Sequence, residues 1–535
     1  MVLNSLNFLL FLGAVVVVYY LVPRKFQWLV LLIASYGFYL SSGVAHLAFI
    51  LATTVFTFLS GRWMQKMRDE SQVKISNLGE EATKEQKLAI KKETAKRIHR
   101  VQVFTALVNL GVLIFIKCIN LAIGGLNDVF ALFKWDASVP FINILVPLGL
   151  SYYTFNSIGY LIDVGRGKLE AEKHIGKFAL FVSFFPSIVQ GPLFRYGDVG
   201  NQLKETHEPN YEALKFGGQL ILWGFFKKLV IADRVAAISN TVFSPDFVDY
   251  GGSQIFFGVL AYSFQIYCDF SGGTDITRGA AQMLGIDLPL NFERPFFATS
   301  MADFWRRWHM SLGAWMREFV FYPIMLCKPV TNVSKKFRKR FGSYAGKIVP
   351  SVAAPLVVFF LIGIWHGVTA QYVVNGLYNA ILISSSVALA PVYTKLAEKL
   401  HVNTETFSFR LFQMLRTFTL LCISRIIVKA PSLGDAFKMI KTMFTDFDLA
   451  FLSGVNGEMY TYGVTEQEMR LLFFCIMVLL VIGILQECGI KIRETLAKQN
   501  LVFRWAIMLI LIFAILIFGM YGPEYDASAF IYGRF

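Results

Sequence analysis

The chain has 535 residues, of which 55% are hydrophobic and only 16% are charged. A soluble domain carries about a quarter charged residues, so this composition excludes an ordinary soluble protein. The formal net charge of +15 would be compatible with a protein that binds nucleic acid. The cations cluster in a few loops, however, which is typical of the cytoplasmic loops of a membrane protein.

Apolar segments recur along the chain at lengths near the ~20 residues that cross a bilayer. Because a backbone in lipid must satisfy its own hydrogen bonds, they predict an all-α, multi-pass helical bundle. A β-barrel would instead show alternating strands of about ten residues. No positive charge precedes the first segment, so we interpret it as a retained span rather than a cleaved signal. The clearest segments are residues 6–22, 101–116, 352–364, 410–428 and 471–485.

Two polar stretches set the expected topology. Residues 64–100 hold more Lys and Arg than acids and include a predicted charged helix over 81–100, and residues 328–347 are basic without any acid. Both are therefore expected in the cytoplasm. Counting onward from Lys347, a span over 348–365 places His366 in the outer half of the membrane. A turn follows, and the chain then returns inward.

Between residues 178 and 325, short apolar pieces alternate with charges and with Gly-Pro and Arg-Pro pairs. Such broken segments occur at membrane depth only where protein or a cavity covers them. We expect re-entrant or tilted helices there. The whole chain is interpreted as one membrane domain, 1–535, with N-terminal helices over 6–121, a catalytic core over 143–390 and C-terminal helices over 394–535.

Two histidines lie in this apolar sequence, and each directly follows a tryptophan. An ionisable side chain at membrane depth is costly and usually has a function. His366 follows Trp365 in a turn between two glycines, where a neutral imidazole can act as a general base. The alternative is a buried histidine that bonds a carbonyl group.

The second histidine, His309, lies in residues 300–320, which have helical periodicity. One predicted face carries Trp305, Trp308, Leu312, Trp315 and Phe319. The neighbouring polar face carries Arg306, His309, Gly313 and Arg317. We interpret this as a helix that lines a polar tunnel, with cations near an anionic donor. The alternative is an interfacial helix with snorkelling arginines.

Four further polar positions are candidates for the same tunnel. Asn375 follows His366 by two to three helical turns, and Gln190 lies in a segment broken by two prolines. Gln265 and Asp269 are four residues apart, so they share a helix face. The Asp269 carboxylate needs a partner, for which Arg278, Arg306 and His309 are candidates, although a structural ion pair is equally compatible. No nucleophile or zinc motif is present, and the six scattered cysteines form no CxxC pair.

Several of these segments resemble the membrane-bound O-acyltransferase family. The resemblance rests on residues 147–155 (PLGLSYYTF), 185–192 (FPSIVQGP), 303–312 (DFWRRWHMSL), 365–367 (WHG) and 530–535 (FIYGRF). Within the family the chain looks like the bacterial branch that acylates secreted polymers, and more like the alginate type than the D-alanyl type. Its closing Tyr-Gly-Arg-Phe departs from the aromatic-rich end of the alginate type.

The resemblance implies about 11–13 transmembrane helices, some tilted or re-entrant, around a thin core with a tunnel. It implies that His366 is the catalytic histidine and His309 a second functional one. It implies no bound cofactor or metal, but an acyl thioester donor on the cytoplasmic side, either acetyl-CoA or a phosphopantetheine-linked carrier. Further expected partners are an extracytoplasmic acyltransferase, a polysaccharide acceptor and membrane lipids.

We therefore predict a plasma-membrane enzyme that transfers an acyl group, expected to be acetyl, to hydroxyls of a cell-envelope polysaccharide. The enzymatic alternative is D-alanyl transfer to teichoic acid from a carrier protein. The alternative of another class is a lipid or polymer transporter, but transporters often show internal repeats, which we do not find here.

Overall fold

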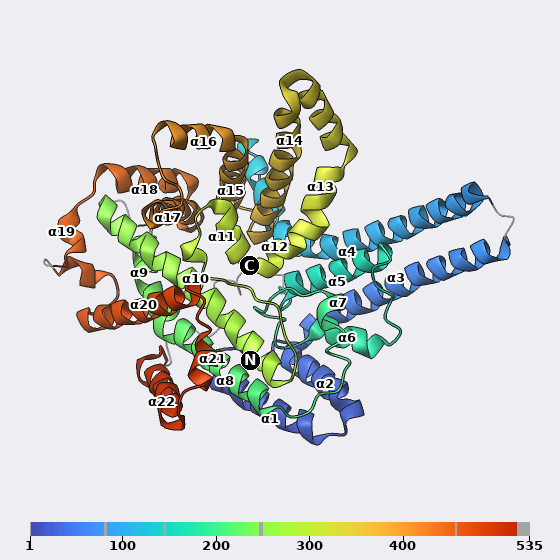
Figure 1. The fold of residues 1–535 in the computed structure, drawn as a ribbon, viewed down its shortest axis with the longest axis horizontal. Helices are drawn as coiled ribbons and strands as arrows, with labels where there is room; N and C mark the ends of the chain where they lie inside the picture. Colours follow the sequence, from blue (N-terminus) through green and yellow to red (C-terminus); the bar gives the residue numbers. More distant parts are fainter. Residues whose placement is uncertain (1, 80–82, 143–145, 246–249, 455–456, 522–535) are drawn as a thin grey trace. The chain divides into compact units, whose positions relative to one another are not determined.

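The computed structural model describes residues 2–79, 83–142, 146–245, 250–454 and 457–521. Figure 1 shows that the regular elements of these residues are helices, and the one isolated β-bridge joins Phe292 to Trp308. The predicted all-α class is therefore confirmed. The terminal motif over 530–535 lies outside the described residues.

The chain divides into two compact units, and each is described by itself. The first comprises Met1–Gly217 and Ala280–Pro289. Its longest helices, α3 and α4, pack together through buried polar contacts, such as the Thr105 hydroxyl donating to the Ser60 hydroxyl (2.8 Å). Its elements are α1 Leu6–Leu21, η1 Arg24–Phe26, α2 Gln27–Leu40, α3 Val44–Asn77, α4 Lys84–Leu132, α5 Leu150–Gly165, α6 Ile175–Ser183 and α7 Tyr196–Val199.

The helix predicted over residues 81–100 is the first part of α4. The helix begins at a capping box, in which the side chains of Thr83 and Gln86 each accept from the other residue's backbone N–H. Such reciprocal caps satisfy two amides that a helix leaves open at its start. The charged segment therefore continues directly into the apolar one as a single helix.

The second unit comprises Gly218–Gly279 and Leu290–Phe535, and α8 Tyr211–Phe225 enters it from the first. It begins with η2 Phe226–Ala232, a short π-helix, followed by α9 Asp233–Val242 and α10 Gly252–Met283. Its central elements are η4 Pro295–Phe297, α11 Met301–Arg307, α12 Met310–Met316, η5 Arg317–Phe321, α13 Tyr322–Leu326, α14 Lys328–His366 and α15 Ala370–Ala388. Its later elements are α16 Ala390–Lys399, α17 Phe407–Lys429, α18 Leu433–Thr445, α19 Leu449–Leu452, η6 Glu458–Thr461, α20 Glu466–Glu487, α21 Ile492–Ala497 and α22 Leu501–Phe518.

Within the described residues, six helices are long and apolar enough to cross a membrane, namely α3, α4, α14, α17, α20 and α22. The bent pair α15 and α16 adds a seventh if it is one span. The protein is thus a multi-pass membrane protein. A count of 11–13 spans would require shorter and broken helices as well, including α1 with its 16 residues.

The basic stretch over 328–347 is a helical hairpin within α14. Gly342 has a φ of +89°, a conformation that glycine adopts without a steric penalty. The Ser334 hydroxyl donates to the carbonyl of Gly346 (2.7 Å), so the two limbs run side by side. The second limb continues as the predicted span and ends at His366.

A cluster of large apolar side chains holds α11 in the second unit. Phe270, Met301, Phe304, Trp308 and Leu421 are each at most 5% exposed. Burying a side chain of this size contributes about 1.5–3 kcal/mol. The cluster therefore fixes α11 against α10 and α17, and with it the segment that carries His309.

Candidate functional site

The single helix predicted around His309 is wrong, because the chain breaks there into α11 and α12. His309 has a left-handed backbone with a φ of +45°. The Glu293 N–H donates to the carbonyl of Arg307 (2.9 Å), and the Met310 N–H donates to the carbonyl of Asn291 (3.0 Å). These long-range bonds compete with the helical ones, so tertiary pairing overrides the local periodicity.

The Asn291 side chain fixes the tautomer of His309. Its Oδ1 accepts from the Ser311 N–H (3.2 Å) and the Ser311 hydroxyl (2.8 Å), and it lies 3.1 Å from Nδ1 of His309. Since this oxygen can only accept, Nδ1 carries the proton and Nε2 keeps a lone pair. Burial, and next the neighbouring His366, lower the pKa of His309 to about 3, so the ring is neutral at pH 7.

Glycines bring α14 and α15 close together around His366. A Cβ on Gly363 would lie 2.6 Å from the carbonyl oxygen of Tyr372, and one on Gly376 would lie 2.3 Å from that of Phe359. Any larger residue would push the two helices apart. This contact places Tyr372 opposite the end of α14, where its ring stacks on His366 at a centroid distance of 6.3 Å.

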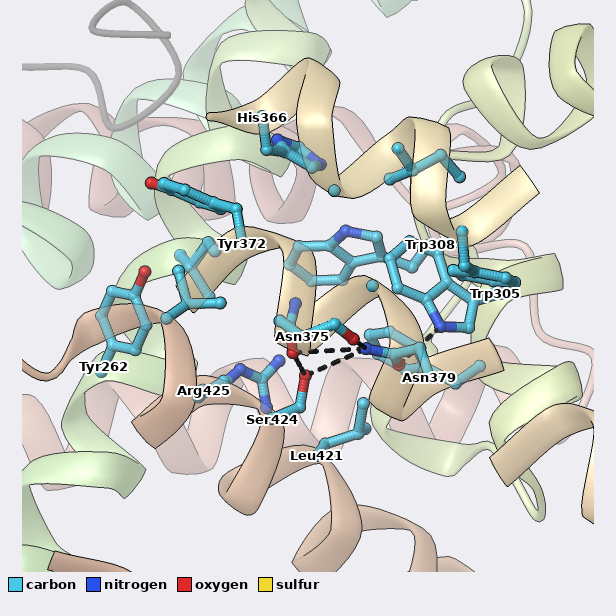
Figure 2. Close-up of a pocket in the computed structure, with 17 residues that line it drawn as sticks. Tyr262, Trp305, Trp308, His366, Tyr372, Asn375, Asn379, Leu421, Ser424 and Arg425 are labelled. Carbon is cyan, nitrogen blue, oxygen red and sulfur yellow. Dashed lines mark hydrogen bonds between the residues drawn. The ribbon is translucent and has the colours of Figure 1, made fainter. Parts of the chain in front are cut away.

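A cavity of about 90 Å³ lies beside His366 in the second unit. In the view of Figure 2, His366 and Tyr372 lie on one side and Ser424 and Arg425 on the other. The volume corresponds to about three water molecules, so it suits a small group. The cavity is lined by Tyr262, Ile266, Phe304, Trp305, Trp308, Phe359, Ile362, Gly363, His366, Tyr372, Asn375, Gly376, Asn379, Leu421, Ser424, Arg425 and Val428.

A hydrogen-bond network forms the polar part of this cavity (Figure 2). Asn379 accepts from the Trp305 indole N–H (3.0 Å) and donates to the carbonyl of Asn375 (2.8 Å). The Ser424 hydroxyl donates to Oδ1 of Asn375 (2.6 Å). The predicted site residues Trp305, Asn375 and His366 thus line one cavity, which Asn379 and Ser424 complete.

Tryptophan rings connect the two histidines. The Trp365 ring lies 4.6 Å from the His366 ring and 6.3 Å from the His309 ring, measured between centroids. Trp308 lines the cavity next to His309. His309 itself is only 2% exposed and is not among the lining residues, so it lies behind the cavity wall.

Arg425 is a cavity residue that the sequence reasoning missed. It is 7% exposed on α17, and its guanidinium lies 5.5 Å from the Phe296 ring centroid and 5.9 Å from that of Trp308. A signal for it was present, because an arginine inside an apolar span is costly and usually functional. The apolar length of residues 410–428 predicts a span but does not single out this arginine.

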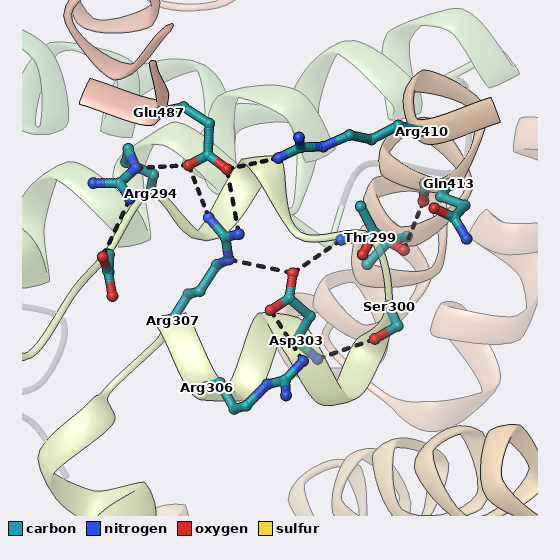
Figure 3. Close-up of polar contacts among 11 residues, drawn as sticks. Arg294, Thr299, Ser300, Asp303, Arg306, Arg307, Arg410, Gln413 and Glu487 are labelled. Carbon is teal, nitrogen blue, oxygen red and sulfur yellow. Dashed lines mark hydrogen bonds and ion pairs between the residues drawn. The ribbon is translucent and has the colours of Figure 1, made fainter. Parts of the chain in front are cut away.

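The arginines of α11 belong to an ion-pair network outside the cavity (Figure 3). Arg306 is 66% exposed and pairs with Asp303 at 3.3 Å. Arg307 pairs with Asp303 (3.2 Å) and with Glu487 (3.0 Å), and Glu487 also accepts from Arg410 (2.9 Å). Arg306, which we expected to line the tunnel, is therefore not among the residues that line the cavity. Arg307 links α11 to the end of α20.

Asp269 has a different ion-pair partner from those expected, which were Arg278, Arg306 and His309. Its carboxylate lies 2.6 Å from Nζ of Lys228, which also contacts Asp233 at 2.7 Å. Lys228 belongs to the π-helix η2 and is 1% exposed. A buried lysine between two carboxylates has its charge compensated, and this pairing agrees with the structural alternative for Asp269.

The remaining predicted residues are not among those that line the cavity. Gln265 is buried and accepts from the Ser239 hydroxyl. Arg317 is exposed in η5. Gln190 is buried in the first unit, in the irregular segment that follows α6. Their predicted roles in a tunnel stay predictions.

Comparison with known proteins relates the chain to one family. The membrane-bound O-acyltransferase family model matches residues 169–417. A probable alginate O-acetylase of Pseudomonas aeruginosa is 30% identical over 449 residues, which cover 83% of this chain and 75% of that protein. The peptidoglycan O-acetyltransferase of Helicobacter pylori is 28% identical over 336 residues (58% and 59%). The teichoic acid D-alanyltransferase of Bacillus subtilis is 31% identical over 247 residues (45% and 59%).

Proposed function

The chain belongs to the membrane-bound O-acyltransferase family, and from this premise we propose that it transfers an acetyl group to hydroxyls of a cell-envelope polysaccharide outside the membrane. The donor is a thioester on the cytoplasmic side, either acetyl-CoA or an acyl group on a phosphopantetheine carrier. An extracytoplasmic acyltransferase is a further proposed partner. Two of the relatives are named as acetyl-transferring proteins, one for alginate and one for peptidoglycan, and this supports the choice of an acetyl group and of a polymer acceptor.

The observation that carries this proposal is that His366 lines a small cavity shared with Arg425 and the Asn375–Ser424 hydrogen bond. In the proposed step, the acceptor hydroxyl oxygen attacks the thioester carbonyl carbon while its proton passes to an imidazole nitrogen of His366. The new ester C–O bond forms, the C–S bond breaks, and the thiolate takes the proton from the imidazolium. Proton transfer by a positioned side chain of this kind raises the reaction rate about 10²–10⁴-fold.

Arg425 supplies the electrostatic part of the proposed step. The thioester carbonyl oxygen becomes an oxyanion as the hydroxyl attacks, and a fixed cation in a dry site stabilises that charge strongly. Arg425 is buried, and the Trp308 and Phe296 rings surround its guanidinium. A charge held in this way needs little reorganisation when the oxyanion forms.

Mass spectrometry of envelope polymers from cells with and without the protein tests the proposal. We expect a polysaccharide that carries O-acetyl groups in cells with the protein and lacks these groups in cells without it. Cells that carry the His366→Ala variant at the same protein level should resemble cells without the protein. Unchanged polymer acylation in those cells would reject the role of His366.

D-alanyl transfer to teichoic acid is the second candidate, because 247 residues of the chain are 31% identical to a D-alanyltransferase. The same polymer measurement separates the two, since a D-alanyl ester adds a larger mass and a titratable amine. A transporter without chemistry predicts a third result. Cells without the protein would carry less polymer outside the membrane, and cells with the His366→Ala variant would show unchanged polymer acylation.

A further inference from the structure

The second unit contains a larger cavity, of about 730 Å³, that the proposed acyl transfer does not use. It lies among α8, α10, α20, α21 and α22, and α20 and α22 both pack on η2. Its residues are Gln219, Leu220, Trp223, Phe226, Lys227, Tyr267, Ser271, Asp275, Arg278, Leu290, Phe292, Glu293, Arg294, Leu471, Phe474, Cys475, Val478, Ile482, Gln486, Gly489, Ile490, Lys491, Ile492, Arg493, Leu496, Ile507, Met508, Ile510, Leu511, Ala514 and Phe518.

One part of this cavity is an apolar wall that two membrane-spanning helices build. Helix α20 contributes residues such as Phe474 and Val478, and α22 contributes residues such as Ile510, Leu511 and Ala514. Both helices are candidate spans with few buried side chains, and Phe474 (65%) and Ile510 (64%) are largely exposed. In a bilayer, such surfaces contact acyl chains. A groove between them is therefore open to a lipid tail.

The other part of the cavity is cationic, and it gathers where α20 ends and α21 begins. Five lining residues are cations, Lys227, Arg278, Arg294, Lys491 and Arg493, whereas Asp275 and Glu293 are the lining acids. The Asp275 carboxylate is shared, at 2.7 Å from Lys227 and 3.9 Å from Arg278. Arg294 pairs with Glu487 (2.7 Å), and Lys491 pairs with the exposed Glu494 (3.1 Å).

Two guanidinium groups in this cluster repel each other. Burial, and next the positive charge of Arg278, lower the pKa of Arg493. Asp275 and Glu494 act in the opposite direction on this pKa and compensate part of the positive charge. A bound anion between the two guanidinium groups would compensate more of it. Arginine is also the side chain whose planar donors best match the oxygens of a phosphate.

We propose that this cavity binds an anionic phospholipid, with its phosphate between Arg278 and Arg493 and its acyl chains along α20 and α22. The combination of a basic end and an apolar groove fits an amphiphile better than a soluble anion. The basic segment from Lys491 to Arg504 is expected at the cytoplasmic face, where anionic lipids concentrate and basic pockets between helices bind their headgroups. The proposal does not depend on the acyl-transfer chemistry.

Native mass spectrometry of the purified full-length protein tests this site. Phosphatidylglycerol and phosphatidylcholine with the same acyl chains are added separately to wild type and to Arg278→Gln, Arg493→Gln and Lys498→Gln. Lys498 is an exposed cation of the same basic segment that does not line the cavity, so it is the matched control. An Ala514→Phe variant fills the apolar part and leaves every charge in place.

We expect wild type and Lys498→Gln to bind phosphatidylglycerol at least tenfold more tightly than phosphatidylcholine. Each arginine variant should bind phosphatidylglycerol about tenfold more weakly, because it loses charge-assisted bonds to the phosphate. Ala514→Phe should weaken both lipids. Three results would each overturn the proposal. Wild type could bind the two lipids equally, or Lys498→Gln could lose as much affinity as the arginine variants. Alternatively, free CoA could displace the lipid while Ala514→Phe has no effect. The last result would mean that the site takes a soluble phosphate.

Discussion

The guanidinium of Arg425 lies 5.9 Å from the ring centroid of Trp308, on the wall of the cavity that His366 also lines. One residue comes from α17 and the other from the break between α11 and α12. The aromatic face holds the cation where water is scarce, which strengthens its field in the cavity. The cavity therefore combines His366, the candidate base, with a fixed positive charge.

Replacement of this charge should reduce catalysis more than stability. We expect Arg425→Met to lower kcat about 10²–10³-fold, the usual effect of removing an oxyanion-stabilising group. Arg416→Met is the matched control, because Arg416 is exposed on the same helix and donates to the backbone carbonyl of Thr299 (2.9 Å). Acyl transfer by the purified proteins, with size-exclusion profiles to confirm folding, measures both effects. If Arg425→Met turned over at the wild-type rate, the proposed role of Arg425 in stabilising the oxyanion would be contradicted.

The Asn379 amide should be a stability determinant of the cavity. It is 1% exposed and bonds Trp305, Asn375 and Ser424. Asn379→Leu leaves these buried polar groups without that partner, so we expect a loss of about 1–3 kcal/mol. The midpoint of denaturation in detergent measures the loss. Asn240→Leu, at an exposed position, should change the midpoint little, and equal effects of the two variants would contradict this account.

The left-handed backbone at His309 determines which substitutions it tolerates. Asn adopts this conformation readily, whereas a β-branched residue does not. We expect His309→Asn to remain folded, because its amide can also donate to Asn291, and His309→Val to lose about 1–3 kcal/mol from backbone strain alone. Thermal denaturation of both variants provides the comparison. Equal stability of the two would show that the positive φ is not constraining.

The burial of His309 also predicts a pH effect on stability. Its folded pKa is about 3, below the ordinary value near 6.5, so between these values the unfolded chain binds a proton that the folded chain does not. Stability is therefore full above about pH 6.5 and falls as the pH drops, by at most about 1.4 kcal/mol per pH unit. His309→Asn should lose less stability than wild type between pH 6.5 and 4.5. Parallel losses would mean that another group accounts for the acid sensitivity.

Glu487 should matter more to stability than a surface carboxylate. It is 18% exposed and accepts from Arg294, Arg307 and Arg410 (Figure 3). Glu487→Gln leaves three arginines close together without that charge, and we expect a loss of about 1–3 kcal/mol. Glu466→Gln breaks only an exposed i,i+4 pair with Arg470, which is worth about 0.5 kcal/mol or less. Denaturation midpoints of the two variants test this difference.

Local signals in the sequence predicted several of the long helices and the turn at His366. Apolar length predicted the spans that form parts of α4, α14, α17 and α20, and the two glycines that flank Trp365 and His366 indicated the turn. Periodicity failed around His309, since pairing with residues 291–293 breaks the helix there. That pairing is a tertiary feature which no local pattern encodes.

The site was predictable only in part, for a similar reason. His366, Asn375 and the tryptophans were predictable because each lies in or near a short motif, around residues 303–312 or around residues 363–378. Ser424 and Arg425 come from α17, some fifty residues later, so their position in the cavity depends on how α17 packs against α15. The ion pair of Asp269 with Lys228 was not among the expected pairs, because the π-helix that precedes α9 brings Lys228 near.

The rate of acyl transfer by purified His366→Ala tests the central claim most directly. Wild type and variant, matched in amount and folding, receive the same acyl thioester and the same hydroxyl acceptor, and the ester product is quantified by mass spectrometry. We predict that the variant still binds the donor but forms ester at least 10²-fold more slowly. Ester formation at the wild-type rate would show that His366 is not the base and would contradict the account.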